Sequence, residues 1–127
     1  MSELIIIFFT GFFCYPILEI LWRGYTHPTM AFAGGLCFLA IYYINFLFYE
    51  KSVFLKAFLS ASIITAVEFI FGYFFNIIKR MNIWDYSAMP YNIMGQICPQ
   101  YFMLWFFLSL LLSPLCNFLK LHIFIKQ

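Results

Sequence analysis

Two carboxylates, Glu19 and Glu68, lie inside apolar stretches that are long enough to cross a lipid bilayer. Only 9% of the residues are charged, whereas 65% are hydrophobic and 24% are aromatic. A chain of 127 residues cannot cover that much apolar surface with a core of its own. We therefore expect an integral membrane protein. A charged side chain at such a depth costs roughly 2.5–3.5 kcal/mol on insertion scales, so each glutamate should be either paired or functional.

Four apolar segments approach or exceed the roughly 20 residues that a helix needs to span the hydrocarbon. They cover about residues 4–22, 30–49, 53–78 and 101–123. A transmembrane barrel would need polar residues at alternate positions, and these runs are too continuously apolar for that. The first run is preceded by the acidic Glu3, where a signal peptide would be basic, so we expect a retained helix. The sequence predicts an all-α, four-helix transmembrane bundle that forms a single domain over residues 1–127.

The connection between the third and fourth helices, residues 79–100, is long and irregular. Pro90 and Gly95 interrupt regular structure, while Trp84 and Tyr86 favour an apolar surface. Such a segment either lies in the membrane interface or dips back into the bilayer as a re-entrant segment. Irregular backbone is tolerated at depth only against protein or a water-filled cavity. The sequence leaves both placements open.

Four spans put both termini on one side of the membrane, and the side richer in Lys and Arg is normally cytoplasmic. The side of the termini carries Lys51, Lys56, Lys120 and Lys126. The opposite side carries Arg23, Lys79 and Arg80. This small excess predicts cytoplasmic termini in the plasma (inner) membrane, although it leaves a dual topology open.

Helical spacing gathers polar side chains toward one end of the predicted bundle. Glu19 and Arg23 are four residues apart on one face of the first helix, with the acid on the N-terminal side, as an ion pair prefers. Glu68 belongs to the third helix, which runs in the same direction as the first, and the segment 79–100 follows it. The predicted binding residues are Glu19, Arg23, His27, Glu68, Trp84, Asp85, Asn92 and Gln96.

The same residues also fit a purely structural network. In that interpretation Arg23 neutralises Glu19, Asp85 caps a short helix, and Glu68 forms a hydrogen bond with a neighbouring Ser or Thr. His27 stands before a proline, where an interfacial histidine often only ends a loop. Both interpretations remain open from the sequence.

Several motifs are distinctive as continuous strings. They are Glu19-Ile-Leu-Trp22-Arg23-Gly24, Trp84-Asp85-Tyr86-Ser87 and Asn92-Ile-Met-Gly95-Gln96-Ile-Cys98. From Glu19 to about Trp105 the chain resembles a family of small membrane proteins described as "Putative ABC-transporter type IV", or CmpB-like permeases. The resemblance implies a four-helix integral membrane protein of the permease type. The chain contains no nucleotide-binding fingerprint, so an ATPase would be a separate chain.

Two functions follow from these observations. In the first, the protein is permease- or channel-like, and it binds or moves a small solute, a cation or a proton through the polar intramembrane cluster. In the second, it is an intramembrane enzyme acting on a lipid head group or a prenyl phosphate. His27 would then be the general base beside Glu19 or Asp85, and Arg23 would hold the phosphate. The sequence has no nucleophile motif, metal triad or paired-Asp signature, so we favour the first function.

The expected partners follow from size and composition. Four short helices enclose little volume, so besides the lipid bilayer we expect a homo-oligomer or a separate transporter subunit. Ala31, Gly34 and Gly35 would allow close helix approach. A net charge of +2 with scattered basic residues does not indicate nucleic acid. The four cysteines lack metal-ligand spacing, and we expect no metal ion and no cofactor.

Overall fold

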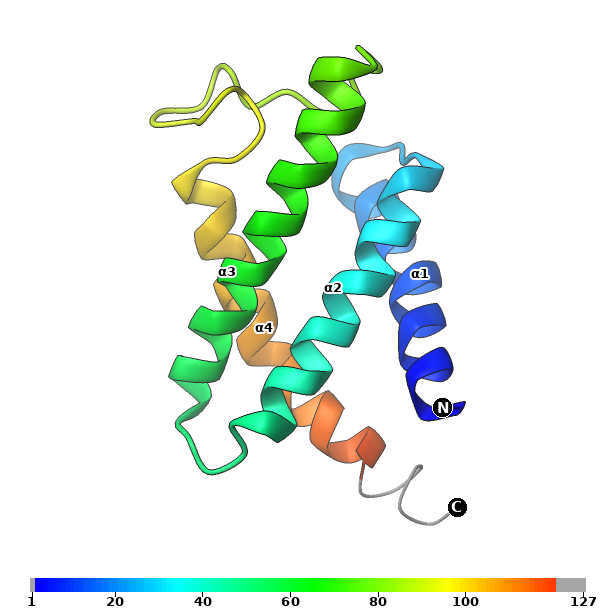
Figure 1. Cartoon of the computed structure of the whole chain (residues 1–127), viewed down its shortest axis with the longest axis vertical. Coiled ribbons are helices and arrows are strands. Elements are labelled where there is room, and N and C mark those ends of the chain that lie inside the picture. Colours follow the sequence, from blue (N-terminus) through cyan, green and yellow to red (C-terminus); the bar gives the residue numbers. More distant parts are fainter. Residues whose placement is uncertain (1, 121–127) are drawn as a thin grey trace.

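The computed structural model describes residues 2–120, most of which lie in four long helical spans (Figure 1). The helices are α1 (Ser2–Arg23), α2 (Pro28–Leu47), α3 (Val53–Phe71) with its continuation η1 (Gly72–Ile78), and α4 (Pro99–Leu119). With α3 and η1 taken as one span, all four are long and apolar enough to cross a membrane. The predicted all-α four-helix bundle is confirmed.

The helix ends differ from the predicted ones by a few residues because local caps set them. α2 begins at Pro28, directly after His27, whose ring accepts a hydrogen bond from a backbone N–H of the first turn. Ser52 caps α3 through its hydroxyl in the same way. α4 begins at Pro99, two residues before its predicted start. Its predicted end at residue 123 lies outside the described residues.

The third span changes from an α-helix to a π-helix at Gly72. A Cβ atom at this position would overlap the side chains of Gln96 and Trp84. The glycine therefore lets the segment between η1 and α4 lie directly against the helix. Short π-helical stretches occur frequently at functional sites.

The helices pack as two pairs around α2. α1 contacts mainly α2, and α4 contacts mainly α3, while α2 also contacts both α3 and α4. α2 is the most deeply buried of the four spans and α1 the least. The buried core consists of Ile7, Phe38, Ile41, Tyr42, Ala61, Ile64, Trp105 and Cys116.

The two glycines of α2, Gly34 and Gly35, pack against α1 of the same chain. A Cβ atom at Gly34 would lie 2.5 Å from Tyr15 Cβ and 2.9 Å from the carbonyl oxygen of Gly11, both on α1. A Cβ atom at Gly35 would lie 2.7 Å from the ring of Phe8. Close helix approach at these glycines occurs between α1 and α2 of one chain, so they supply no argument for contact between copies.

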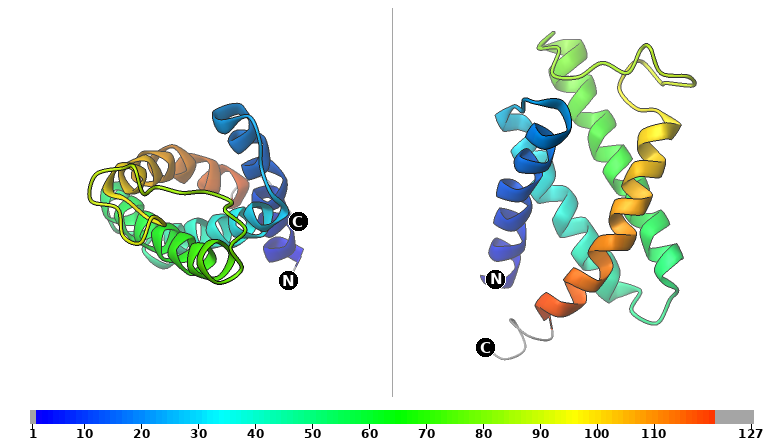
Figure 2. Two further views of the ribbon diagram at one scale, coloured as in Figure 1. Left: turned by 90° about the horizontal axis from the view of Figure 1, so that it is seen from above. Right: turned by 180° about the vertical axis from the view of Figure 1, so that it is seen from behind.

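The start of α1, the α2–α3 turn and the end of α4 lie at one end of the bundle (Figures 1 and 2). A salt bridge of 3.0 Å between Lys120 Nζ and Glu3 Oε1 ties the first turn of α1 to the end of α4. Which side of the membrane this end faces stays a prediction. Lys126, which contributed to the predicted topology, lies outside the described residues.

The segment between η1 and α4 lies across the opposite end of the bundle, over α3 and α4 (Figure 2). It is irregular, as predicted, but side chains fix it in place. Trp84 Nε1 donates a hydrogen bond to the carbonyl oxygen of Gln96 at 3.1 Å. Asn76 of η1 donates to Gln96 Oε1 at 2.8 Å and accepts from the backbone N–H of Ile83 at 2.6 Å. Ile83, Trp84 and Gln96 are all buried.

Candidate functional site

Glu19 and Arg23 lie together in the last turns of α1. Arg23 Nη2 is 3.2 Å from Glu19 Oε2, and the hydroxyl of Thr26 donates to Glu19 Oε1 at 2.7 Å. Arg23 Nη1 also donates to the carbonyl oxygen of Ile83 at 3.1 Å, and the guanidinium stacks 4.5 Å above the ring of Tyr25. The pair therefore neutralises a buried carboxylate and ties α1 to the segment between η1 and α4.

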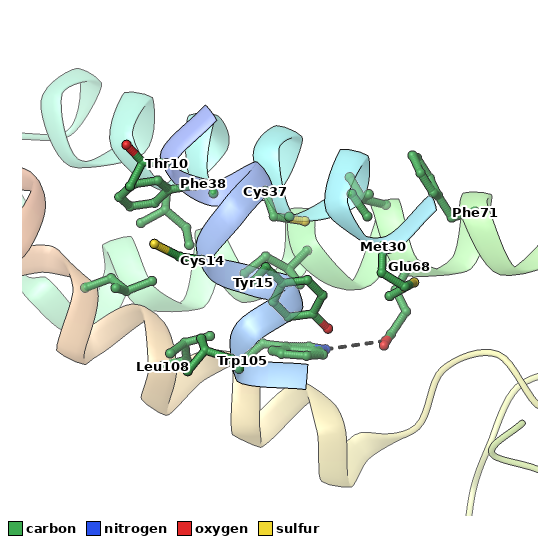
Figure 3. Close-up of a pocket in the computed structure, with 18 of the residues that line it drawn as sticks. Thr10, Cys14, Tyr15, Met30, Cys37, Phe38, Glu68, Phe71, Trp105 and Leu108 are labelled. Atoms are coloured by element: carbon green, nitrogen blue, oxygen red, sulfur yellow. Dashed lines mark hydrogen bonds between the residues drawn. The ribbon is translucent and has the colours of Figure 1, made fainter. Parts of the chain in front are cut away.

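Glu68 on α3 is only 8% exposed and is held by aromatic donors. The hydroxyl of Tyr86 donates to Glu68 Oε2 at 2.8 Å. Trp105 Nε1 donates to Glu68 Oε1 at 3.4 Å (Figure 3). Burial and the Glu68 carboxylate raise the pKa of Tyr86, which keeps its hydroxyl protonated as a donor. Within residues 2–120 no salt bridge reaches Glu68. Its partners are thus not the neighbouring Ser or Thr of the structural interpretation.

Two neighbouring cavities lie between α1 and the other helices. The first, here the apolar cavity, has a volume of about 130 Å³, and among the described residues Glu68 is the one charged residue in its wall (Figure 3). The second, here the aromatic cavity, has a volume of about 190 Å³ and contains Glu19 and Arg23 in its wall. The two cavities share the wall residues Tyr15, Leu18, Met30, Trp84, Trp105 and Leu108.

Tyr15 lines both cavities, the apolar cavity that contains Glu68 in its wall and the aromatic cavity that contains Glu19. In Figure 3 the hydroxyl of Tyr15 points toward the Trp105 indole and Glu68. Three further residues of the site, Tyr15, Tyr86 and Trp105, were not predicted from the sequence. For Tyr15 a signal was present, because it lies one helical turn before Glu19.

The predicted site residues of the segment between η1 and α4 lie at different distances from the cavities. Trp84 forms part of both cavity walls. Gln96 is buried behind it and supports it through the bonds to Asn76 and Trp84. Asn92 stays within its own loop, where it donates to the carbonyl oxygen of Met89 at 2.9 Å and accepts from the N–H of Gly95 at 2.9 Å.

His27 and Asp85 line neither cavity. His27 Nδ1 accepts from the backbone N–H of Thr29 at 3.2 Å and caps α2. Asp85 is exposed, and its Oδ1 accepts from the backbone N–H of Ser87 at 2.9 Å. This hydrogen bond lowers the pKa of Asp85 below its usual range. The structure thus brings Glu19, Arg23, Glu68 and Trp84 together around the cavities, and leaves His27, Asp85 and Asn92 outside.

The side chains that commonly bind metal ions do not form a cluster in the described part of the chain. Within residues 2–120, no group of three or more His, Cys, Asp or Glu residues is placed to hold a metal ion. The cysteines in this range are all free thiols, with Cys98 and Cys116 buried. The walls of the two cavities contain carboxylates, a guanidinium and aromatic rings, together with the hydroxyl of Thr10 and the thiols of Cys14 and Cys37.

Comparison with known proteins adds one finding. The family described as "Putative ABC-transporter type IV" matches residues 6–126, which includes the whole stretch from Glu19 to Trp105 that carries the resemblance. No curated protein and no solved structure matches the chain. With its four apolar helices the chain is an integral membrane protein related to transport. It belongs to the Putative ABC-transporter type IV family.

Proposed function

We propose that the protein is permease-like and binds a cation or a proton at Glu68 on its way through the bundle. The observation that carries the proposal is the buried Glu68 carboxylate, which faces a cavity and has no cationic partner within residues 2–120. A buried charge without a counter-charge is costly. An incoming cation or proton would offset that cost, which gives the cavity a reason to bind one.

The hydrogen bonds of Glu68 leave room for a ligand. A carboxylate offers about four lone-pair sites, and two donors, Tyr86 and Trp105, contact Glu68. The donors would hold the carboxylate in place while a cation binds its remaining sites. Glu19 is already neutralised by Arg23, so we assign it a secondary role in binding the cation. The cation would reach it through the adjoining aromatic cavity.

The enzymatic alternative has one observation in its favour. Arg23 Nε is buried and makes no hydrogen bond within the described residues, and a guanidinium with an unused N–H suits a phosphate. In that function Arg23, His27 and Asp85 would act on a lipid head group or a prenyl phosphate. His27 caps a helix and Asp85 is exposed, so we place this function second.

We further propose that the protein works as a homo-oligomer or with a separate transporter subunit, in the plasma (inner) membrane with cytoplasmic termini. α1 supports the first part, because it is the least buried span and exposes Phe9, Phe13 and Leu21. Contact between copies on this face would complete the outer wall of the cavities. An ATPase, which the family description suggests, would be one such separate chain.

Flux through reconstituted protein tests the proposal. The chain is placed in liposomes, a pH or cation gradient is imposed, and flux is followed with pH- and cation-sensitive dyes. We expect Glu68→Gln to reduce flux by at least about tenfold. Glu50→Gln, the same change in the exposed turn between α2 and α3, should leave flux unchanged. If Glu68→Gln transports like the wild type and mass spectrometry shows altered lipids, the enzymatic function replaces this one.

A further inference from the structure

The wall of the aromatic cavity is unsuited to a metal cation. It is built from Tyr15, Trp22, Trp84, Tyr86, Tyr101 and Trp105, together with apolar side chains, Glu19 and Arg23. Calcium takes about six to eight oxygen ligands. The described part of this wall has one carboxylate, Glu19, which is already bound to Arg23 and Thr26. Aromatic faces instead attract cations whose charge lies beneath methyl or other apolar groups.

The rings form a continuous wall from α1 to the segment between η1 and α4. Tyr86 and Tyr101 stack with centroids 4.5 Å apart and planes within 9°. Tyr101 lies 6.1 Å from Trp105, which lies 6.3 Å from Tyr15. This wall carries the ring quadrupoles that bind quaternary ammonium groups in aromatic cages.

Glu68 accepts hydrogen bonds from two rings of this wall. Although its carboxylate faces the apolar cavity, its two donors, Tyr86 and Trp105, both line the aromatic cavity. A ring that donates a hydrogen bond to a carboxylate becomes richer in electrons, and its face then attracts a cation more strongly. Because Arg23 balances Glu19, the uncompensated charge that residues 2–120 place around the two cavities is that of Glu68, which matches one positive charge on a ligand.

The volumes set the size of the ligand. A cavity of about 150 Å³ accommodates benzene, so the aromatic cavity, at about 190 Å³, has room for a compact methylated ammonium head. The adjoining apolar cavity, at about 130 Å³, is lined by side chains such as Phe38, Ile41 and Leu112. It has room for a short alkyl or aryl substituent.

Resting on the proposed function, we propose that its cation is a monovalent methylated ammonium ion. The head lies where the two cavities meet, against Tyr101 and Trp105 and close to Glu68, and a small apolar substituent extends into the apolar cavity. A trimethylammonium group occurs both in free ions and in lipid head groups, and both sources present the same chemistry to this wall.

Calorimetric titration of the full chain in nanodiscs tests the inference. The probes are benzyltrimethylammonium, tetramethylammonium, potassium and the much bulkier tetraphenylphosphonium. We expect the first two to bind, benzyltrimethylammonium more tightly, and the last two not to bind. Nanodiscs of phosphatidylcholine are compared with nanodiscs of phosphatidylglycerol. Weaker apparent binding in phosphatidylcholine assigns the site to a lipid head group, and equal binding assigns it to a free ion.

Substitutions at Tyr101 connect binding to the aromatic wall. Tyr101→Leu should weaken binding of tetramethylammonium on the order of tenfold, whereas Tyr101→Phe keeps the ring face and should bind like the wild type. Tyr49→Leu makes the same change at an exposed tyrosine in the turn between α2 and α3 and should have no effect. Circular dichroism and size-exclusion profiles verify that each variant is folded.

The outcomes separate the inference from the proposed function. Glu68-dependent binding of potassium or protons without binding of either methylated ammonium ion overturns the inference and leaves the proposed function standing. Equal affinities for Tyr101→Leu and Tyr101→Phe also overturn the inference, because the ring face would then be irrelevant. If no cation binds and the wild-type protein supports no flux, both proposals fail.

Discussion

The two faces of α1 differ in how closely they meet their neighbours. Toward α2 the backbones nearly touch, because Gly11 and Gly34 face each other without side chains between them. Toward α4 the two cavities intervene, and Tyr15 bridges the space to Trp105 with ring centroids 6.3 Å apart. Lipid is as apolar as the helices, so no hydrophobic effect closes such a gap. The shapes of the side chains decide which face closes and which stays open.

The largest effect is expected on the closed face. Gly34→Leu places a branched side chain where a single Cβ atom would already overlap Tyr15. We expect a loss in the free energy of unfolding of about 1–3 kcal/mol or more. Ala66→Leu on the exposed side of α3 is the control and should be nearly neutral. Unfolding in mixed detergent, followed by tryptophan fluorescence, measures both. Equal stabilities would show that the α1–α2 contact is not tight.

Filling a cavity on the open face of α1, the face toward α4, should affect cation binding more than the free energy of unfolding. Leu112→Trp projects a larger ring into the apolar cavity, so cation binding should weaken on the order of tenfold. Its effect on unfolding should be smaller than that of Gly34→Leu, because the space is not already filled. Leu111→Trp makes the same change one residue earlier on an exposed position and should bind like the wild type. Titration calorimetry separates the two variants, and unchanged binding by Leu112→Trp would remove the apolar cavity from the site.

A smaller effect is expected where α1 meets the segment between η1 and α4. Glu19→Gln and Arg23→Gln should each destabilise the protein, because each leaves its partner charge without a counter-charge. The double variant should be less unstable than the sum, with an interaction energy of roughly 0.5–3 kcal/mol. Thermal unfolding of the four proteins completes the cycle. Strict additivity would contradict the ion pair.

The smallest effect is expected at Asp85, outside the open face. Its pKa is lowered in the folded protein, so its ionised form stabilises the fold at neutral pH. That contribution should be lost as the pH falls below about 3.9, the unfolded value, toward the folded pKa. Asp85→Asn should therefore lower the thermal midpoint slightly at neutral pH and leave it unchanged in acid. A variant that abolishes flux would instead place Asp85 in the functional site.

The features that the sequence predicted correctly are local. Continuous hydropathy predicted four helices, and a spacing of four residues placed Glu19 beside Arg23. The partners of Glu68 were not predicted, because Tyr86 comes from an irregular segment and Trp105 from a helix whose rotation hydropathy does not fix. The π-helix that begins at Gly72 and the close contact of Gln96 and Trp84 with this glycine were not predicted either, because hydropathy does not place a loop against a helix.

The polar residues of the connecting segments show a further limit of prediction. His27 and Asn92 are polar residues of segments that connect apolar helices, and composition alone makes them candidates for a site. In the structure His27 caps α2, and Asn92 closes a turn of its own loop. Local hydrogen bonding of this kind competes with any functional role, and only the three-dimensional arrangement distinguishes the two.

Chemical labelling of Glu68 tests the central claim most directly. Dicyclohexylcarbodiimide is an apolar reagent that modifies carboxyl groups within membranes, and peptide mass spectrometry locates the product. We predict that Glu68 is modified, that the exposed Glu50 is not, and that the transported cation slows modification of Glu68 in proportion to its occupancy. Modification of Glu68 at a rate independent of every cation that the protein transports would contradict a binding role for this carboxylate.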